Sequence, residues 1–516
     1  MRARLFILLL ALAGCETPPP GMFVTSAREA ARAEDAGADL QGQACLGRPA
    51  ATATGRATEL FCGGWTQPAA RVIELDGPTD PASLLALAQG GAWRAGLDGR
   101  MSCDAPEPTA AAGSRAAVIM SCRRRIGGWP HLALVAAGPR GPVLADGLPA
   151  ALPAIERVIA GTTTAAATRS AALQVAAARL AAERFGTDQV GRYEALITLG
   201  AELNQAEAFA AAADAYRAAL ALQDRVLGPN HPDSVTAVLH LALNLSNMGR
   251  EVEAAPLFAQ AERLAPRATD PVAPARLLHY RGLDAANRGD HARAARLLEE
   301  AERGYLALVP PGVAAAPQRG LAEQVAPPLA LDPVGQSALL GLVEVRRNRG
   351  VALARAGRSE EAARLSAQSR ALMQRAGLSE GVVIARSLRS EGMANEALAR
   401  PEAQRLYAQA AAGFASAQPG ERPEAVTLFL SGARLAALGR SAEALADFRR
   451  GAAILRARQL GLPVSLVQPY LDVLAAGAGA DPALATEAFS AIQLARRDGT
   501  ARLVAQASAR LAAAGG

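Results

Sequence analysis

The pattern of apolar and polar residues changes once along the chain, near Gly161. Before that point, short apolar runs alternate with Gly, Pro and Asp, which is typical of strands separated by turns. After it, the sequence becomes repetitive and helical in pattern. The runs that we expect to be strands are 59–62, 71–75, 116–122 and 131–136, and the helices that we expect before Gly161 are 81–90 and 152–159. We therefore predict a mainly α protein, with a small α+β domain over residues 42–160 ahead of a helical array.

A repeated unit is clearest between Val235 and Pro266. Two antiparallel helices can approach closely only where small side chains lie at their crossing, with large side chains filling the space beside it. Large and small residues follow this rule at Leu241, Ala242, Leu245, Gly249, Ala254, Phe258 and Ala261, and Pro266 ends the unit. This spacing resembles that of the tetratricopeptide repeat, a pair of antiparallel helices.

The same offsets recur in five further units, which start near Tyr193, Ala275, Val343, Ile384 and Ala425. The connector Leu227-Gly228-Pro229-Asn230-His231-Pro232-Asp233 resembles the linker of kinesin-light-chain-like tetratricopeptide proteins. The resemblance implies an α-solenoid in two halves, 169–309 and 334–514, in which the first helix of each repeat lines the concave face. We interpret the Pro-rich insert 310–333 between the halves as a flexible break, and a functional insert is the alternative.

The first residues have the pattern of an export signal. Arg2 and Arg4 precede an apolar run, Leu5–Leu12, that is too short to span a bilayer. The sequence Leu12-Ala13-Gly14-Cys15 resembles the lipobox of bacterial lipoproteins, in which cleavage precedes the Cys and its thiol is lipidated. An ordinary signal peptide with a chance Cys is the alternative.

The lipobox resemblance implies a signal peptide over residues 1–14, lipidation of Cys15 and a lipidated tether over 15–41. Glu16 after the Cys implies sorting to the outer membrane, so we expect an envelope lipoprotein that faces the periplasm and is held to the membrane by its acyl chains. The later sequence has no stretch of some 18 consecutive strongly apolar residues, the length expected of a membrane-spanning helix.

The other four cysteines, Cys45, Cys62, Cys103 and Cys122, all lie in the predicted α+β domain. An even number of cysteines in an exported chain indicates disulfides, whereas the close Cys-x-x-Cys pairs of a zinc site are absent from the sequence. Of the three possible connectivities we favour Cys45–Cys62 with Cys103–Cys122, because each pair brackets a predicted hairpin.

Composition narrows the classes of protein to consider. The chain has 516 residues, of which 51% are hydrophobic but only 4% aromatic, and this disfavours an all-β core and favours closely packed helices. The formal net charge is +6, and all 54 basic residues are Arg, interspersed with acidic residues. Because no basic stripe results, we expect no nucleic-acid partner.

Candidate chemistry is sparse. The five histidines are His131, His231, His240, His279 and His291, and the sequence contains no zinc-protease motif and no phosphate-binding glycine loop. We expect His231 to form a turn in its connector, and adjacent carboxylates such as Glu299-Glu300 to be solvated. We therefore predict no catalytic residue, no metal site, no cofactor and no enzymatic activity.

The expected function is the binding of a protein or peptide partner in the concave groove, as a scaffold or adaptor. Asn side chains there could hold an extended backbone, because an amide both donates and accepts hydrogen bonds. The candidate groove residues are His240, Leu243 and Asn247 from the second repeat and Arg276, His279, Tyr280 and Asn287 from the third.

A second resemblance lies near the end of the sequence. Ala488–Ala495, Thr500-Ala501 and Ala507–Leu511 are similar to the helical segment that precedes the caspase-like peptidase domain of bacterial tetratricopeptide–CHAT proteins, and Cys62-Gly63-Gly64-Trp65 is similar to an element of their amino-terminal regions. The alternative function is therefore the recognition half of a CHAT-type peptidase whose catalytic domain is lost or separately encoded. The His/Cys dyad of that peptidase has no counterpart in this sequence, so we assign peptidase activity to no residue of this chain.

Overall fold

The computed structural model describes residues 34–50, 55–63, 68–111, 115–161, 187–309, 333–375, 381–479 and 481–495. The chain divides into two compact units. The first contains residues up to Ala95, Cys103–Cys122 and Pro130–Gly191, and the second contains Gly96–Ser102, Arg123–Trp129 and the chain from Arg192 onward. The signal peptide, Cys15 and nearly all of the Pro-rich insert lie outside the described residues.

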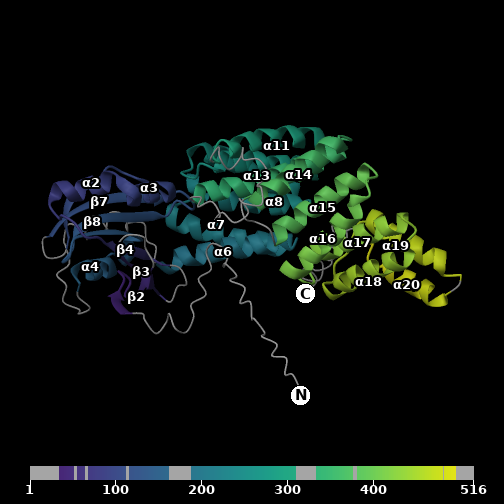
Figure 1. Cartoon of the computed structure of the whole chain (residues 1–516), viewed down its shortest axis with the longest axis horizontal. Coiled ribbons are helices and arrows are strands. Elements are labelled where there is room, and N and C mark those ends of the chain that lie inside the picture. The colour runs from purple at the N-terminus through teal and green to yellow at the C-terminus, as the bar shows by residue number, and fades with distance from the viewer. Residues whose placement is uncertain are drawn as a thin grey trace, which may run out of the picture. The chain divides into compact units, whose positions relative to one another are not determined.

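The first unit is built around a nine-stranded sheet (Figure 1). The strands are β1 Glu34–Ala38, β2 Ala44–Ala50, β3 Arg56–Cys62, β4 Ala70–Glu74, β5 Met101–Cys103, β6 Glu107–Ala111, β7 Arg115–Arg124, β8 Pro130–Ala137 and β9 Pro142–Gly147. Their order is β1-β2-β3-β4-β9-β8-β7-β5, and β6 pairs with β7 outside this path. All four predicted strands are therefore present, as parts of β3, β4, β7 and β8.

Both predicted disulfides are confirmed. Cys45 and Cys62 are direct partners in the antiparallel register of β2 and β3, and their sulfur atoms are bonded. Cys103 on β5 is bonded to Cys122 on β7. The two bonds close loops with sequence separations of 17 and 19 residues, and loops of this size contribute roughly 3 kcal/mol each by constraining the unfolded chain.

Helices pack against the middle of the sheet. Helix α2, Pro81–Gln89, contacts β8, and α4, Leu152–Ala160, contacts β1, β4 and β9. Strands β8 and β9 are accordingly buried along almost their whole length, which explains why they read as continuous apolar runs rather than alternating ones. Helix α2 begins at Asp80, whose carboxylate accepts a hydrogen bond from the backbone of Ser83 at 3.0 Å.

The second unit is a solenoid of seven antiparallel helix pairs (Figure 1). The pairs are α6 Thr187–Gln205 with α7 Phe209–Leu227, α8 Val235–Asn247 with α9 Glu251–Leu264, α10 Ala273–Asn287 with α11 His291–Leu306, α13 Pro333–Arg355 with α14 Ser359–Arg375, α15 Val382–Ala397 with α16 Glu402–Ala417, α17 Arg422–Ala437 with α18 Ser441–Ala457, and α19 Val464–Gly477 with α20 Pro482–Ile492. The first six coincide with the predicted repeats, so the tetratricopeptide-type fold is confirmed. The remaining helix of the described chain is α3, Gly91–Arg100.

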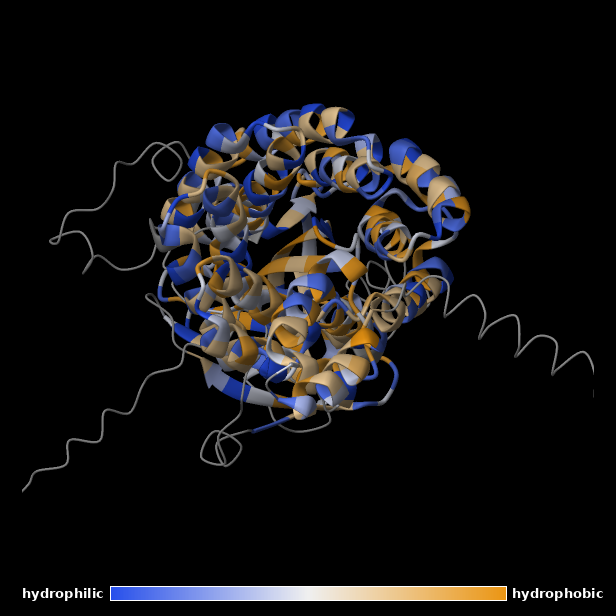
Figure 2. Cartoon of the chain, turned by 90° about the vertical axis from the view of Figure 1, so that its right-hand side faces the viewer, coloured by the Kyte–Doolittle hydropathy of each residue, from blue (hydrophilic) through white to orange (hydrophobic). Residues whose placement is uncertain are grey.

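In repeats one, two, three, five and six the second helix carries a buried small–large–small motif, whereas the fourth repeat has Ser366 at the large position. In the second repeat the motif is Ala254, Phe258 and Ala261, each with 0% of its surface exposed. The corresponding triplets in repeats one, three and five are Ala212–Tyr216–Ala219, Ala294–Leu298–Ala301 and Ala403–Tyr407–Ala410, also at 0%. Figure 2 shows the result, with apolar and polar stretches alternating on the same helices. One large side chain on the second helix therefore fills part of the core in each of these five repeats, together with buried Ala, Leu and Val residues.

A glycine on the first helix receives this large side chain. A Cβ built on Gly432 would lie 2.8 Å from the ring of Phe448, and one on Gly392 would lie 2.8 Å from the ring of Tyr407. Gly200 faces Tyr216 in the same way, at 2.7 Å. The close approach of the two helices therefore requires the absence of a side chain at this position.

The connectors between repeats are held together by a buried carboxylate. His231 forms the expected turn, because its Nδ1 accepts a hydrogen bond from the backbone of Asp233 at 3.3 Å. The Asp233 carboxylate in turn accepts hydrogen bonds from the backbone and the hydroxyl of Thr269, at 2.7 and 2.8 Å, in the next connector. Successive turns are thus joined to each other as well as to their own helices.

Two features of the fold differ from the sequence interpretation. Glu34–Ala38, within the segment assigned to the tether, is strand β1, and it pairs with β2. Gly and Ala make up three of its five residues, which hid it among polar sequence. The pair α19–α20 extends the solenoid by a seventh repeat-like unit, where only flanking helices were expected. None of the described helices is long and apolar enough to cross a membrane.

Replacing Gly432 with Ala tests the close approach. Phe448 is fully buried, so the added methyl group forces a shift, and we expect a net loss of about 1–3 kcal/mol in the free energy of unfolding despite the higher helix propensity of Ala. Gly479→Ala is the matched control, because Gly479 is exposed and a Cβ there meets nothing within 4 Å. Urea unfolding followed by circular dichroism measures both. Equal stability of the two variants would contradict the packing argument.

Candidate functional site

The first helices of consecutive repeats lie beside one another and form the inner layer of the solenoid. The predicted groove residues lie on two of these helices, α8 and α10. The structure joins four of them, His240, Arg276, His279 and Tyr280, into one polar cluster, which we call the inner-face network. Its other members are Tyr216, Thr236, Asp270, Tyr305, Ser337 and Asn348.

His240 lies between two tyrosines of neighbouring repeats. Its ring stacks on Tyr216, with centroids 4.7 Å apart and planes 15° apart, and meets Tyr280 edge-on at 5.2 Å. The Tyr280 hydroxyl lies 3.2 Å from Nδ1 of His240. One imidazole therefore connects repeats one, two and three.

Arg276 connects the second, third and fourth repeats. Its guanidinium donates to the Asp270 carboxylate at 2.9 Å, to the Thr236 hydroxyl at 3.1 Å and to the Ser337 hydroxyl at 2.9 Å. Burial opposes the charge on Arg276, but the ion pair with Asp270 outweighs it and raises the pKa of the guanidinium. The buried charge is thus paired and hydrogen-bonded, as a stable buried cation must be.

His279 extends the network to the fourth repeat and is only 4% exposed. The amide Nδ2 of Asn348 donates to its Nε2 at 2.8 Å, so the neutral ring carries its proton on Nδ1. Nδ1 lies 3.4 Å from the Tyr305 hydroxyl oxygen, which accepts a hydrogen bond from this N–H. Both ring nitrogens are therefore engaged within the protein.

Burial determines the protonation of the two histidines. It lowers the pKa of His240 to about 3, with a further contribution from the positive charge of Arg276. Burial also lowers the pKa of His279 to about 3. The negative charge of Glu344 would raise this pKa, but the effect of burial is larger. Both imidazoles are neutral near pH 7, and burial raises the pKa of Tyr280 to about 12, so this hydroxyl remains protonated.

Amide pairs link the first helices at the ends near the intra-repeat turns. Nδ2 of Asn287 donates to Oδ1 of Asn247 at 2.9 Å, and Nδ2 of Asn204 donates to Oδ1 of Asn244 at 2.9 Å. The partners are 40 residues apart in both pairs. Asn287 is exposed, whereas Asn244 is buried and also donates to the carbonyl oxygen of His240.

The structure thus brings together six of the seven predicted groove residues in two connected rows. The seventh, Leu243, is buried, with 6% of its surface exposed, so it is not available as a contact in the free chain. The sequence interpretation placed His279 and Arg276 on an open surface, but they lie in a covered network. It missed Tyr216, Tyr305 and Asn348, whose roles depend on contacts between different repeats.

The inner-face network is arranged for cohesion between repeats rather than for proton transfer, because its histidines are neutral and bonded to protein groups. Among the described residues, no group of three or more His, Cys, Asp and Glu side chains is placed to hold a metal ion. The groups left open to a ligand are the amides at the exposed end of the row, above all Asn287.

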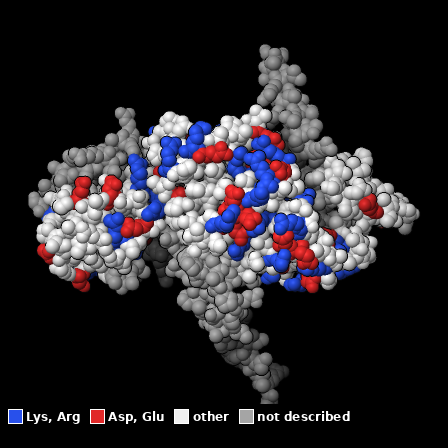
Figure 3. Space-filling model, turned by 90° about the horizontal axis from the view of Figure 1, so that it is seen from above, with Lys and Arg blue, Asp and Glu red and all other residues white. Residues whose placement is uncertain are grey.

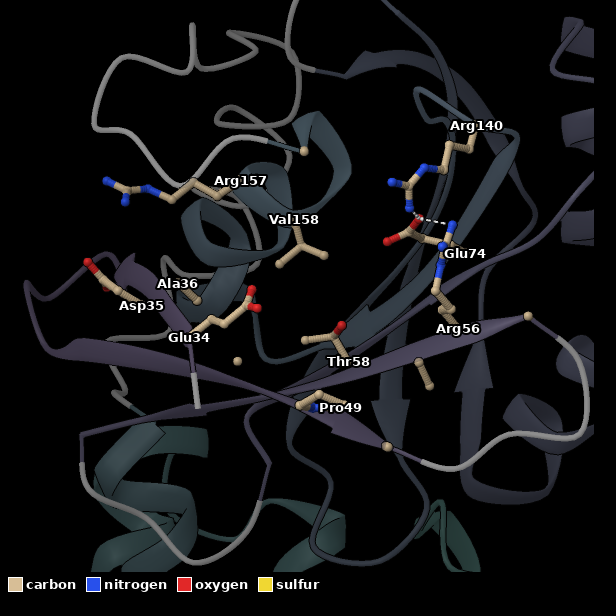
Figure 4. Close-up of a pocket in the computed structure, with 15 residues that line it drawn as sticks. Glu34, Asp35, Ala36, Pro49, Arg56, Thr58, Glu74, Arg140, Arg157 and Val158 are labelled. Carbon is tan, nitrogen blue, oxygen red and sulfur yellow. Dashed lines mark hydrogen bonds and ion pairs between the residues drawn. The ribbon is translucent and has the colours of Figure 1, made fainter. Parts of the chain in front are cut away.

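The first unit contains a cavity of about 700 Å³ lined by residues of β1, β2, β3 and α4 (Figure 4). Arg56 and Arg140 converge on the carboxylate of Glu74, at 3.4 and 3.8 Å, whereas Arg157 points away from them. The guanidinium of Arg157 covers Gly37, where a Cβ would lie 2.3 Å from its central carbon. Carboxylates and guanidiniums share this lining, so its charge favours no single class of ligand.

Comparisons with known proteins concern the fold alone. No protein-family model matches the sequence, and no curated protein matches it. The structure is similar to that of BtubC (BKLC) from P. vanneervenii, over 50% of this chain and 93% of that one, with 18% identity and a TM-score of 0.34. It is also similar to two structures of the Podosopora anserina putative kinesin light chain nearly identical TPR-like repeats, one of them a point variant.

The Podosopora matches cover 44% of this chain and 95% or 97% of theirs, with 20% identity and TM-scores of 0.29. Scores this low carry no argument about function. The assignment of a tetratricopeptide-type solenoid therefore rests on the helix pairing and packing described above.

Acid should weaken the folded state through the buried His279 and the partly buried His240. Their pKa in the unfolded chain is about 6.5, so between that value and about 3 the unfolded state binds protons that the folded state does not. Stability is then fully present above pH 6.5 and falls by up to about 1.4 kcal/mol per pH unit for each histidine as the pH decreases. We expect the thermal midpoint to fall from pH 6.5 to pH 5.

His279→Gln should remove about half of this histidine contribution, because the variant has one fewer buried imidazole. His291→Gln, at the first position of α11 and outside the inner-face network, should keep the pH dependence of the wild type. Differential scanning calorimetry from pH 7 to pH 5 measures these midpoints. The same pH dependence in all three proteins would show that His279 does not carry the effect.

Proposed function

We propose that this chain is a non-catalytic scaffold whose solenoid binds an extended segment of a protein partner along its inner face. The observation that carries the proposal is the row of amide pairs between consecutive first helices, Asn204–Asn244 and Asn247–Asn287. An extended peptide presents one donor and one acceptor per residue, and an amide matches both. In the described part of the chain, no group donates to Oδ1 of Asn287, which leaves this oxygen for a partner.

The outer surface supports this choice of face. On the side that Figure 3 shows, basic and acidic side chains are interspersed. They pair within and between repeats, as where the exposed Arg449 on α18 donates to Glu487 on α20, at 2.9 and 2.8 Å. Charges satisfied in this way give no large field of one sign that would attract a nucleic acid.

We further propose that lipidation of Cys15 anchors the chain to the outer membrane, with the solenoid facing the periplasm. The support is the sequence Leu12-Ala13-Gly14-Cys15-Glu16 after the apolar run. The two disulfides agree with an oxidising compartment.

The double variant Asn247→Ala/Asn287→Ala tests the binding face. Each lost amide contact is worth about 1 kcal/mol, so partner recovery should fall about tenfold or more. The Asn247–Asn287 hydrogen bond is exposed, but Asn287 also donates to the hydroxyl of the buried Ser246 at 3.0 Å, so we expect a loss of about 1 kcal/mol in the free energy of unfolding. The measurement is quantitative affinity capture from solubilised envelope with the full chain as bait.

Gln409→Ala is the matched control, because Gln409 is an exposed amide on the second helix of a repeat, α16. We expect it to recover the same partners in the same amounts as the wild type. If the double variant also does so, the amide row is not the binding face.

Cys15→Ala tests the anchor. Metabolic labelling with palmitate should label the wild-type chain and leave the variant unlabelled, and the variant should pass from the membrane fraction to the soluble fraction. Cys45→Ala is unsuitable as a control because it breaks a disulfide, so Thr17→Ala serves as the neighbouring neutral change. Equal labelling of wild type and Cys15→Ala would exclude this anchor.

A further inference from the structure

The first repeat is joined directly to the fifth and sixth repeats. The end of α6 and the turn that follows it meet α15 and α17, which lie 182 and 215 residues further along the chain (Figure 1). In a solenoid each repeat contacts its immediate neighbours, so stacking alone does not produce this link. We call it the clasp. It consists of the carbonyl groups of Asn204 and Gln205, the carboxylate of Glu207, and the side chains of Arg386, Arg389 and Arg422.

Three arginines bind the end of α6 and the turn after it. Nη2 of Arg386 donates to the two carbonyl oxygens of the clasp, at 3.2 and 3.1 Å. The carboxylate of Glu207 accepts a hydrogen bond from Nη2 of Arg389 at 3.3 Å and another from Nη1 of Arg422. Because the C-terminal end of a helix carries partial negative charge, the backbone of α6 and the carboxylate attract the arginines together.

Glu207 supplies the charged group of the first repeat in the clasp. It occupies the turn position that Gly249 has in the second repeat, and it shares the positive φ of that glycine, at 59°. Burial alone would raise the pKa of Glu207, but the three arginines together outweigh burial and lower it. The carboxylate is therefore ionised near pH 7, and its attraction to the arginines explains a charged residue where the backbone favours glycine.

The clasp differs in kind from the contacts between successive repeats. Apolar clusters hold those repeats together, one from the first repeat to the third and another from the sixth to the seventh. The contacts described for the clasp are hydrogen bonds and ion pairs, and 13%, 15% and 20% of the side chains of Glu207, Arg389 and Arg422 are exposed. Separated charges regain water and are screened by salt, whereas a separated cluster exposes apolar surface. The clasp can therefore open while the apolar clusters remain intact.

The fourth repeat, between the two sides of the clasp in the sequence, has no large side chain at its helix crossing. Ser366 faces Gly350 there, whereas the first, second, fifth and sixth repeats bury an aromatic ring. The hydroxyl of Ser366 is buried and has no hydrogen-bond partner among the described residues. Because a unit with fewer buried apolar contacts deforms more easily, this repeat can absorb the change in curvature that opening requires.

The clasp lies at one end of the amide row. Nδ2 of Asn204 donates to Oδ1 of Asn244 at 2.9 Å, and the carbonyl oxygen of Asn204 accepts from Arg386 on α15 at 3.2 Å. The same residue thus belongs to both the row and the clasp. With the clasp closed, an extended chain that follows the row to the end of α6 meets α15 there.

We propose that the clasp is a salt-sensitive gate at this end of the amide row. The closed clasp holds α15 and α17 to the end of α6, and the open clasp lets an extended partner reach the row from that end. The access of a partner rests on the proposed function, whereas the opening of the clasp does not, so the two are measured separately.

Small-angle X-ray scattering of the full chain, in about 0.1 M and about 1 M sodium chloride, tests the opening. Between these concentrations the Debye length falls from about 10 to about 3 Å, which weakens the ion pairs of the clasp. We expect the radius of gyration of the wild type to increase at the higher concentration. Glu207→Gly removes the carboxylate at a position that suits glycine, so its radius of gyration should already be larger at the lower concentration and should change little with salt.

Ala399→Gly is the matched control, because it places glycine at the equivalent turn position of the fifth repeat, where φ is 56°. It should match the wild type at both salt concentrations, and circular dichroism should show the same helix content in all three proteins. Equal radii of gyration for the wild type and Glu207→Gly at both concentrations would overturn the proposal. A salt response that persists in full in Glu207→Gly would also overturn it, because that response would arise outside the clasp.

Affinity capture from solubilised envelope, with the same variants as bait, tests the access of a partner. Because apparent affinity rises with the fraction of open chains, Glu207→Gly should recover severalfold more partner than the wild type, and Ala399→Gly the same amount. Adding Asn247→Ala/Asn287→Ala should abolish the gain. If Glu207→Gly expands but recovers no more partner, the gate is overturned and the proposed function stands. If the double variant alone recovers as much as the wild type, the proposed function is wrong, and the scattering result is unaffected.

Discussion

The close approach of two helices at a glycine, facing one large side chain, is the contact on which the solenoid depends. Gly200, Gly392 and Gly432 leave the space that Tyr216, Tyr407 and Phe448 fill, and each of these rings is fully buried. Burial of one such ring is worth roughly 1.5–3 kcal/mol, and in a solenoid these local contributions add from repeat to repeat. In the third repeat Leu298 takes the place of the ring beside Gly282, and in the fourth Ser366 faces Gly350.

Close packing also determines what becomes of the polar side chains on the first helices. Once the repeats stack, His279 is buried and His240 and Arg276 are only partly exposed, and they are tolerated because each finds partners in the neighbouring repeats. Apolar contacts hold the two helices of a repeat together, whereas these hydrogen bonds fix the register between repeats. The polar residues that looked like a ligand surface are to a large extent part of the interior.

Local patterns were enough to predict the parts of the fold that depend on near neighbours in sequence. The recurring spacing of small and large residues identified the six repeats, and the predicted hairpins bracketed by Cys45–Cys62 and Cys103–Cys122 identified the disulfides. The candidate site was predicted only as a set of residues on two helices. Tyr305 and Asn348 could not be predicted as site residues, because they lie 26 and 69 residues from His279 in the sequence. The periodicity within one repeat does not indicate contacts between residues so far apart.

Local patterns predict the curvature of the solenoid even less, because it brings the first repeat to the fifth across 182 residues and to the sixth across 215. The local sequence feature that accompanies this long-range contact is Glu207, which stands in the α6–α7 turn where most other repeats have glycine. Ala399 adopts the same conformation without an ionic partner, so the backbone alone does not demand a charged residue there. The carboxylate of Glu207 is explained by the arginines that it meets, because Arg389 and Arg422 join the first repeat to the fifth and sixth through it.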